Sequence, residues 1–124
     1  MSHAGDLSRV EFDRLLDQTG GPAVMVHGGA GTPPDADPAR YLEGTRRAAE
    51  AGLRALMQGG SALDAAQAAA VVLEDDPNFN AGTGAALTSD GEVELDASCM
   101  DGTTLRAGAV ACVKTLENVR KAVA

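Results

Sequence analysis

Apolar residues recur with two different periods along this chain, and the change of period separates a helical part from a strand-forming part. In residues 38–58 they return every three or four positions, after the helix-start pair Asp37-Pro38 and before Gly59-Gly60. In residues 61–76 an Ala-rich stripe follows Ser61 and Asp64, which have the spacing of a capping box. We therefore predict two closely packed helices joined by a tight glycine turn. Their predicted inner faces comprise Tyr41, Thr45, Ala48, Ala49, Gly52, Leu53 and Leu56, and Leu63, Ala66, Ala69, Ala70 and Leu73.

The period shortens to two after residue 84. Segments 85–88 and 92–100 flank Ser89-Asp90-Gly91, a hairpin signal, and in the second segment apolar residues alternate with acids and Ser98. A second turn at Asp101-Gly102 leads to residues 107–113, an unbroken run of small apolar residues that is typical of a central strand covered on both faces. Segment 23–26 has the pattern of a further buried strand. Residues 8–20 have that of a short helix, and Asn118 has that of the N-cap of a further helix over 119–124.

These elements predict an α/β (α+β) fold that needs more chain than is present. A sheet covered on both faces requires a second layer, and nothing in this sequence supplies one. The sequence is therefore typical of the first part of something larger. Residues 1–21 are interpreted as an N-terminal extension and residues 22–124 as part of one domain.

Composition narrows the function classes. The chain has 124 residues and a formal net charge of −8, and its aromatic residues are one Tyr and two Phe. An acidic chain with so few stacking side chains is a poor nucleic-acid binder. No apolar run is long enough for a membrane span and no signal peptide is recognisable, so we expect a soluble, cytoplasmic protein. Cys99 and Cys112 form no metal or disulfide pattern, and we expect both to be small buried apolar residues.

Five motifs in a fixed order carry a resemblance to a known family. They are VHGGAG at residues 26–31, GGSALDA at 59–65, LEDDPNFNAGTG at 73–84, ELDA at 94–97 and MDGTTLRAGAV at 100–110. In this order and spacing they resemble the N-terminal (α-subunit) part of the plant-type (type 2) L-asparaginase and isoaspartyl peptidase family of N-terminal-nucleophile (Ntn) hydrolases. The resemblance covers residues 22–124. Glycosylasparaginase and threonine aspartase share parts of it, but the Asn-Ala-Gly-Thr-Gly loop favours the asparaginase branch.

The resemblance implies an αββα sandwich that is incomplete without a β subunit. In the family a precursor cleaves itself, and the threonine at the start of the β subunit is the nucleophile, activated by its own α-amino group. None of the eight threonines here matches that position, and the substrate-binding Arg and Asp and the oxyanion hole also belong to the β part. The implied assembly is an αβ heterodimer that pairs as (αβ)2 and hydrolyses a small amide or β-aspartyl peptide. This chain alone is expected to be inactive, and an inactive remnant or a non-enzymatic interaction module is the alternative.

The motifs imply accessory active-site residues in this chain. Asn80 matches an Asn beside the family nucleophile, and His27, Gly28 and Gly29 match a flexible loop near it that is implicated in self-cleavage. The alternatives are an Asn that satisfies loop backbone groups and a His that merely ends a strand. The 27–32 stretch lacks the Lys and glycine spacing of a phosphate loop.

The segment 73–83 resembles the family loop that holds a structural sodium ion through main-chain carbonyls. The implied ligands are the carbonyl oxygens of Leu73, Glu74, Asp76, Phe79, Ala81 and Thr83. No cofactor is implied for the chemistry. From the residues alone the acids of this loop are either a carboxylate calcium site or solvated helix-end acids; acids at a helix C-terminus oppose the macrodipole, so we expect some compensation. Glu94, Asp96 and Asp101 are expected to cap turns and face water rather than form an acid–base pair.

Overall fold

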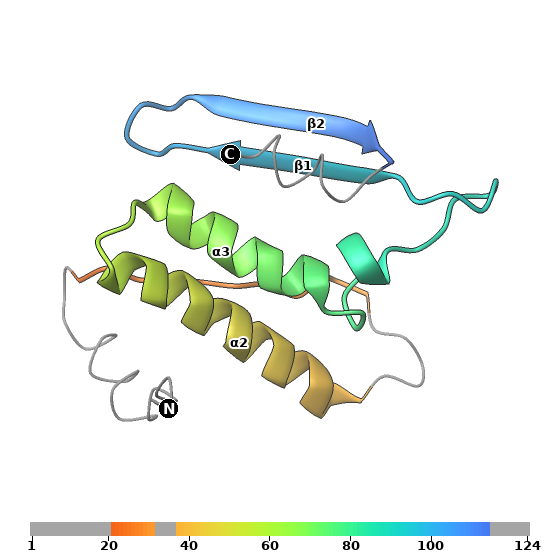
Figure 1. Cartoon of the computed structure of the whole chain (residues 1–124), viewed down its shortest axis with the longest axis horizontal. Helices are drawn as coiled ribbons and strands as arrows, with labels where there is room; N and C mark the ends of the chain where they lie inside the picture. Colours follow the sequence, from red (N-terminus) through yellow and green to blue (C-terminus); the bar gives the residue numbers. More distant parts are fainter. Residues whose placement is uncertain (1–20, 32–36, 115–124) are drawn as a thin grey trace, which may run out of the picture.

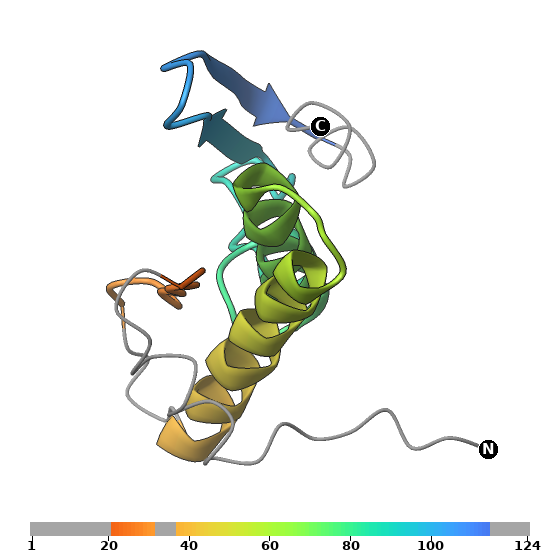
Figure 2. The same ribbon diagram turned by 90° about the vertical axis from the view of Figure 1, so that its left-hand side faces the viewer.

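The computed structural model describes residues 21–31 and 37–114, which form a small α+β unit. Helices α2 (Pro38–Met57) and α3 (Ala62–Asp75) run antiparallel, side by side, and the single-turn 3-10 helix η1 (Gly82–Gly84) follows α3. Strands β1 (Leu95–Met100) and β2 (Ala107–Val113) form a sheet on the α3 side of the helix pair (Figure 1). The extended segment 21–31 lies along one side of the two helices, apart from the sheet (Figure 2).

Both helices begin where their capping residues predict. The Asp37 carboxylate accepts the Ala39 N–H at 3.0 Å, and Pro38 fills the first helical position, where no N–H is needed. Ser61 and Asp64 form the predicted capping box, with Ser61 Oγ accepting the Asp64 N–H at 3.1 Å. Gly59 has a φ of +86°, the left-handed conformation that ends a helix, and so allows the tight turn between the two helices.

Small residues bring the two helices close together. Gly44, Ala48, Gly52 and Leu53 are buried on α2, and Ala65 and Ala69 on α3. A Cβ at Gly52 would lie 2.9 Å from the Ala65 carbonyl oxygen, so only glycine fits there. Of the predicted inner-face residues, Ala48, Gly52, Leu53 and Ala69 are buried. Leu63, Ala66 and Ala70 of α3 are exposed instead, because the buried face of α3 is turned by one residue and runs through Ala65 and Ala69.

The β-hairpin forms across the second predicted turn, and its first strand keeps the predicted alternation but is shorter than predicted, because it begins at Leu95. β1 and β2 pair antiparallel, and Leu95, Ala97 and Cys99 are half-buried while their neighbours in β1 are exposed. Residues 85–88 form no strand, because only Leu87 and Val93 pair, as an isolated bridge across the predicted turn. The predicted bounds of β2 are confirmed. The prediction that it is a central strand buried on both faces is wrong for the described residues, because the sheet has two strands and most of β2 is exposed.

A β-bulge interrupts the hairpin at Ala111 and Cys112. The register shifts between Leu95 and Ala97, and Cys112 takes the left-handed conformation with a φ of +55°. Its N–H donates to the Asp96 carboxylate at 2.9 Å, so the side chain of the opposing strand replaces the missing ladder bond. The prediction that Cys112 is buried is wrong, because the bulge leaves it exposed; Cys99 is half-buried.

The strand predicted at residues 23–26 is not formed, and the two predicted terminal helices are not described by the structure. Within the described residues, segment 23–26 is extended but forms no strand, since no strand lies beside it; Val24 packs on Gly52 instead, and Met25 is 96% exposed. The helices predicted for 8–20 and 119–124 fall outside the described residues. Among the described helices, none combines the length and apolar character that crossing a membrane requires.

The turn after β1 confirms the predicted capping role of Asp101. Its carboxylate accepts the Thr104 hydroxyl at 2.7 Å and the Thr103 N–H at 2.9 Å. These two hydrogen bonds, the hydroxyl one first, lower the pKa of Asp101 below its ordinary value.

Candidate functional site

Residues 27–31, the start of α2 and the distant segment after α3 surround one open depression of about 1030 Å³. Residues 27–31 form one wall, the first turn of α2 a second, and the loop that follows α3 a third. The four predicted accessory residues, His27, Gly28, Gly29 and Asn80, all line it. The fold therefore brings together residues that the sequence motifs only placed in separate loops.

The 27–29 turn fixes the orientation of its imidazole. His27 Nδ1 accepts the Gly29 N–H at 3.1 Å, so a neutral ring carries its proton on Nε2. Gly29 has a φ of +108°, a conformation that other residues rarely adopt, so the turn depends on glycine at this position. His27 is exposed and lies in the wall of the depression.

Asn80 is oriented by the backbone of its own loop. Its Oδ1 accepts the Ala86 N–H at 2.8 Å, which is the loop-satisfying role considered as the alternative. This bond uses only the carbonyl end of the amide. The Nδ2 donors at the other end take no part in it, and the exposed side chain lines the depression. The structural and the functional interpretation of Asn80 are therefore compatible.

Main-chain carbonyls in the 73–83 segment pack closely against two glycines. A Cβ at Gly84 would lie 2.6 Å from the Pro77 carbonyl oxygen, and a Cβ at Gly82 would overlap the Glu74 carbonyl oxygen. These carbonyls therefore leave room only for glycine at the two positions. The carbonyls of Asp76, Phe79 and Ala81 each accept one loop N–H, and each keeps a second lone pair. In the stretches that the structure describes, no group of three His, Cys, Asp or Glu side chains is arranged for a metal ion. The sodium site expected in this loop stays a prediction.

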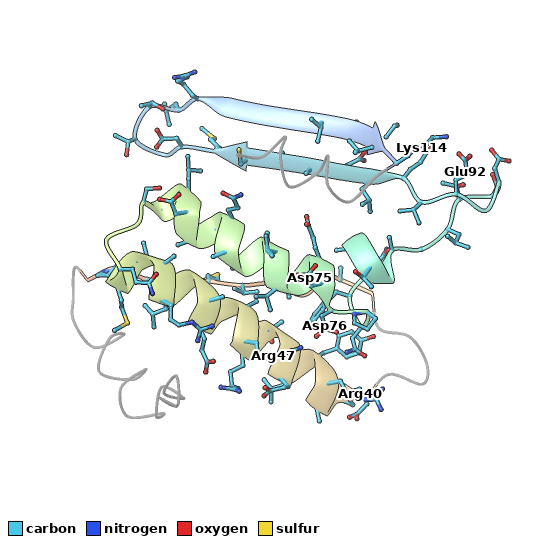
Figure 3. The ribbon with its side chains drawn as sticks, in the orientation of Figure 1. Arg40, Arg47, Asp75, Asp76, Glu92 and Lys114 are labelled. Carbon is cyan, nitrogen blue, oxygen red and sulfur yellow. The ribbon has the colours of Figure 1, made fainter. Side chains whose placement is uncertain are left out.

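An ion pair between α2 and the end of α3 supplies the compensation expected for acids at this helix C-terminus. Asp76, only 5% exposed, accepts from Arg47 Nη2 at 2.5 Å, and its other oxygen accepts the Asn78 N–H at 3.0 Å and the Asn78 amide at 2.6 Å. Figure 3 shows Arg47 reaching from α2 to Asp76 at the start of the loop. The helix-end acids indicated that a partner was needed, but no sequence pattern indicated which residue provides it.

The packing of the Phe79 ring is a second feature that the sequence analysis did not predict. The ring is 3% exposed and meets Tyr41 of α2 edge-on, with centroids 5.6 Å apart. A Cβ at Gly28 would lie 2.7 Å from its Cε1. Tyr41 and Phe79 thus meet in the lining of the depression. The only signal in the sequence that marks them is that aromatic residues are rare in this chain.

The mouth of the depression carries charge from the start of α2. Arg40 and Asp37 both line it, with Arg40 Nε 3.6 Å from an Asp37 carboxylate oxygen and the Arg40 side chain 71% exposed. Exposed pairs of this kind contribute little to stability.

Comparison with known proteins gives a consistent match. The family model described as asparaginase matches residues 20–123. The chain is 52% identical over 98 residues to the isoaspartyl peptidase/L-asparaginase of Homo sapiens, covering 78% of this chain and 32% of that protein. It is 54% identical over 97 residues to the plant-type L-asparaginase of Pyrococcus abyssi, covering 77% of this chain and 32% of that protein. The chain thus spans about a third of the length of the curated relatives it matches. Because the family model covers nearly all of its residues, the chain belongs to the asparaginase family.

Proposed function

We propose that this chain is the α-subunit part of an enzyme that hydrolyses the side-chain amide of asparagine or the β-aspartyl peptide bond. The proposal is supported by membership of the asparaginase family and by the names of the relatives, isoaspartyl peptidase/L-asparaginase and plant-type L-asparaginase. The observation that carries it is the meeting of Asn80 with the 27–29 turn on one depression. In this proposal a β subunit completes the αββα sandwich, covers the exposed strand β2 and pairs with this chain as αβ and (αβ)2.

The proposed chemistry divides the work between the two subunits. The hydroxyl of the β subunit's N-terminal threonine attacks the amide carbon, and its own α-amino group takes the proton. The α-ammonium group returns this proton to the leaving nitrogen, so that the amine or ammonia departs and an ester remains. Water then hydrolyses the ester and frees the threonine hydroxyl. Asn80, held by Ala86 through its carbonyl end, directs its NH2 group toward the reacting carbonyl. His27, Gly28 and Gly29 form the glycine-rich wall of the same site.

A sodium ion is proposed to stiffen the loop that carries Asn80. The main-chain carbonyls of Leu73, Glu74, Asp76, Phe79, Ala81 and Thr83 would hold it. When bound, the ion neutralises the carbonyl dipoles that meet there and fixes the loop; it takes no part in the amide chemistry. We further propose that the assembled enzyme works in the cytoplasm.

Coexpression of this chain with a β subunit that begins with threonine tests the function. The complex should release ammonia from L-asparagine or cleave a β-aspartyl dipeptide, and this chain alone should do neither. Intact mass spectrometry of native material should find the companion chain. A lone 12.5 kDa species without activity in either preparation would favour the non-enzymatic alternative.

Two substitutions at one position test the role of Asn80. Asn80→Asp keeps an acceptor for the Ala86 N–H but removes the NH2 donor, whereas Asn80→Ala removes both. If the donor acts on the reacting carbonyl, both variants should lose about 100-fold in kcat, the typical cost of removing one such donor. Activity retained by Asn80→Asp but lost by Asn80→Ala would reduce Asn80 to a loop-stabilising residue.

A further inference from the structure

The Phe79 side chain connects two walls of the depression that are separate in the sequence. Its ring is buried, although Asn80 beside it is exposed. It packs edge-on against Tyr41 of α2, with ring planes at 87°. The loop after α3 is polar along most of its length, so this ring is its main apolar anchor.

Two glycines shape the space that the ring fills. A Cβ at Gly28 would lie 2.7 Å from Phe79 Cε1, and a Cβ at Gly44 would lie 2.7 Å from Phe79 Cζ. Neither glycine is among those with positive φ, so the backbone at both positions accepts alanine. The ring itself, rather than backbone strain, is what requires glycine at these two positions.

This arrangement makes the two walls depend on one another. Closely packed side chains cannot yield at one contact without moving at the others. On one side of the ring, Gly28 lies between His27 and Gly29, which are joined by the Nδ1 hydrogen bond. On the other side, the next residue is Asn80, whose amide is fixed to Ala86.

We infer that Phe79 is a positioning residue: wedged between Gly28 and Gly44, its ring sets the placement of Asn80 relative to the 27–29 turn. What this placement serves rests on the proposed function. The coupling itself is a property of this chain and is measurable without any activity.

The first experiment measures the coupling by NMR on the 124-residue chain. Gly28→Ala should shift the backbone amide resonance of Ala86 and the side-chain amide resonances of Asn80, although it lies on the opposite wall. Gly31→Ala is the matched control in the same loop, since a Cβ there meets no atom within 4 Å. In the Phe79→Leu background, which lacks Cε1, the effect of Gly28→Ala should largely disappear.

Further resonances keep this experiment decisive if a variant folds poorly. The Asp64 amide, bound to Ser61 at the far end of α3, should keep its position in every folded variant. If Gly28→Ala unfolds the chain, Phe79→Leu alone should move the amides of both Gly29 and Ala86. The inference is overturned if Gly28→Ala moves Ala86 no more than Gly31→Ala does, or if the Gly28 and Phe79 effects simply add.

The second experiment uses the complex with the β subunit. Gly28→Ala should lower kcat per folded enzyme by about 100-fold, the cost of a displacement of about 1 Å in a catalytic group, with much less change in KM. In the Phe79→Leu background the same substitution should cost far less. If the wild-type complex is inactive, the proposed function fails while the NMR coupling stands. If the wild-type complex is active and kcat is unchanged in Gly28→Ala, the positioning role is overturned.

Discussion

Replacing Arg47 by methionine should destabilise the fold more than any other single arginine change in α2. The substitution keeps an unbranched apolar stem and a similar helix propensity but removes the guanidinium that faces Asp76. The Asp76 carboxylate is 4% exposed and would keep only its hydrogen bonds from Asn78. A buried charge would thus lose its counter-charge.

The expected magnitude lies between two limits. Breaking a fully buried ion pair costs about 3–5 kcal/mol, and losing an exposed pair costs about 0–1 kcal/mol. Because the Arg47 side chain is 51% exposed, water partly replaces it, and we expect a loss of about 2 kcal/mol. Arg54→Met is the matched control: its side chain is 53% exposed and its Nη1 lies 3.9 Å from a Glu50 oxygen, so the expected loss is about 0.5 kcal/mol.

Equilibrium unfolding in urea, followed by the helical circular dichroism signal, measures both variants. With a urea dependence of about 2 kcal/mol per M, Arg47→Met should lower the midpoint by about 1 M and Arg54→Met by about 0.25 M. The slope should stay the same, since neither change alters the surface exposed on unfolding. Equal midpoint shifts in the two variants would show that Asp76 does not need Arg47, and that the ion pair does not hold the loop to α2.

Three other predictions concern charge, the cation loop and the bulge. Ser61 holds the pKa of Asp64 below its ordinary value, mainly through its backbone N–H and secondly through its hydroxyl. The stability that this carboxylate provides is therefore present above the unfolded-state pKa, and it is lost as the pH falls through the folded-state pKa. Asp64→Asn should therefore flatten the acid side of a plot of urea midpoint against pH, and an unchanged plot would exclude the cap as its cause. In the assembled protein, Asp75→Asn should leave the sodium-dependent rise in melting temperature intact, whereas Gly82→Val should abolish it, because Gly82 has a φ of +50°; the opposite result would indicate a carboxylate site. Cys112→Gly should raise the free energy of unfolding in urea by about 1 kcal/mol, because glycine adopts the left-handed conformation of residue 112 without strain. Cys112→Val should lower it. A Cys112→Val variant more stable than Cys112→Gly would contradict a left-handed conformation at this position.

The helices could be predicted because several local signals agree at each end. Asp37 with Pro38, Ser61 with Asp64, and the intervening glycines fix both termini before any packing is considered. The face of α3 could not be predicted as well. A run of alanines offers no contrast between adjacent positions, so the choice of Ala65 over Ala66 is made by contact with α2 rather than by the sequence.

The residues that line the candidate site could be predicted from the sequence, but the residues that hold them in place could not. Motif matching indicated Asn80 and the 27–29 turn, and the fold places them on one depression. The acids at the end of α3 indicated a missing positive partner. α2 carries four arginines, however, and only the packed helix pair determines that Arg47 is the one that meets Asp76. The contact of Phe79 with Gly28 joins residues so distant in sequence that no local pattern could indicate it.

The regular spacing of small residues in α2 has a consequence for the order of folding. Gly44 and Gly52 lie inside the helix, where each glycine disfavours the helical state by about 0.5–1 kcal/mol relative to alanine. A 20-residue segment with two such positions is only weakly helical in isolation. α2 must therefore acquire its structure largely on contact with α3 and with the Phe79 ring. During synthesis α2 emerges from the ribosome before α3, yet it becomes stable only after the chain beyond residue 79 has followed.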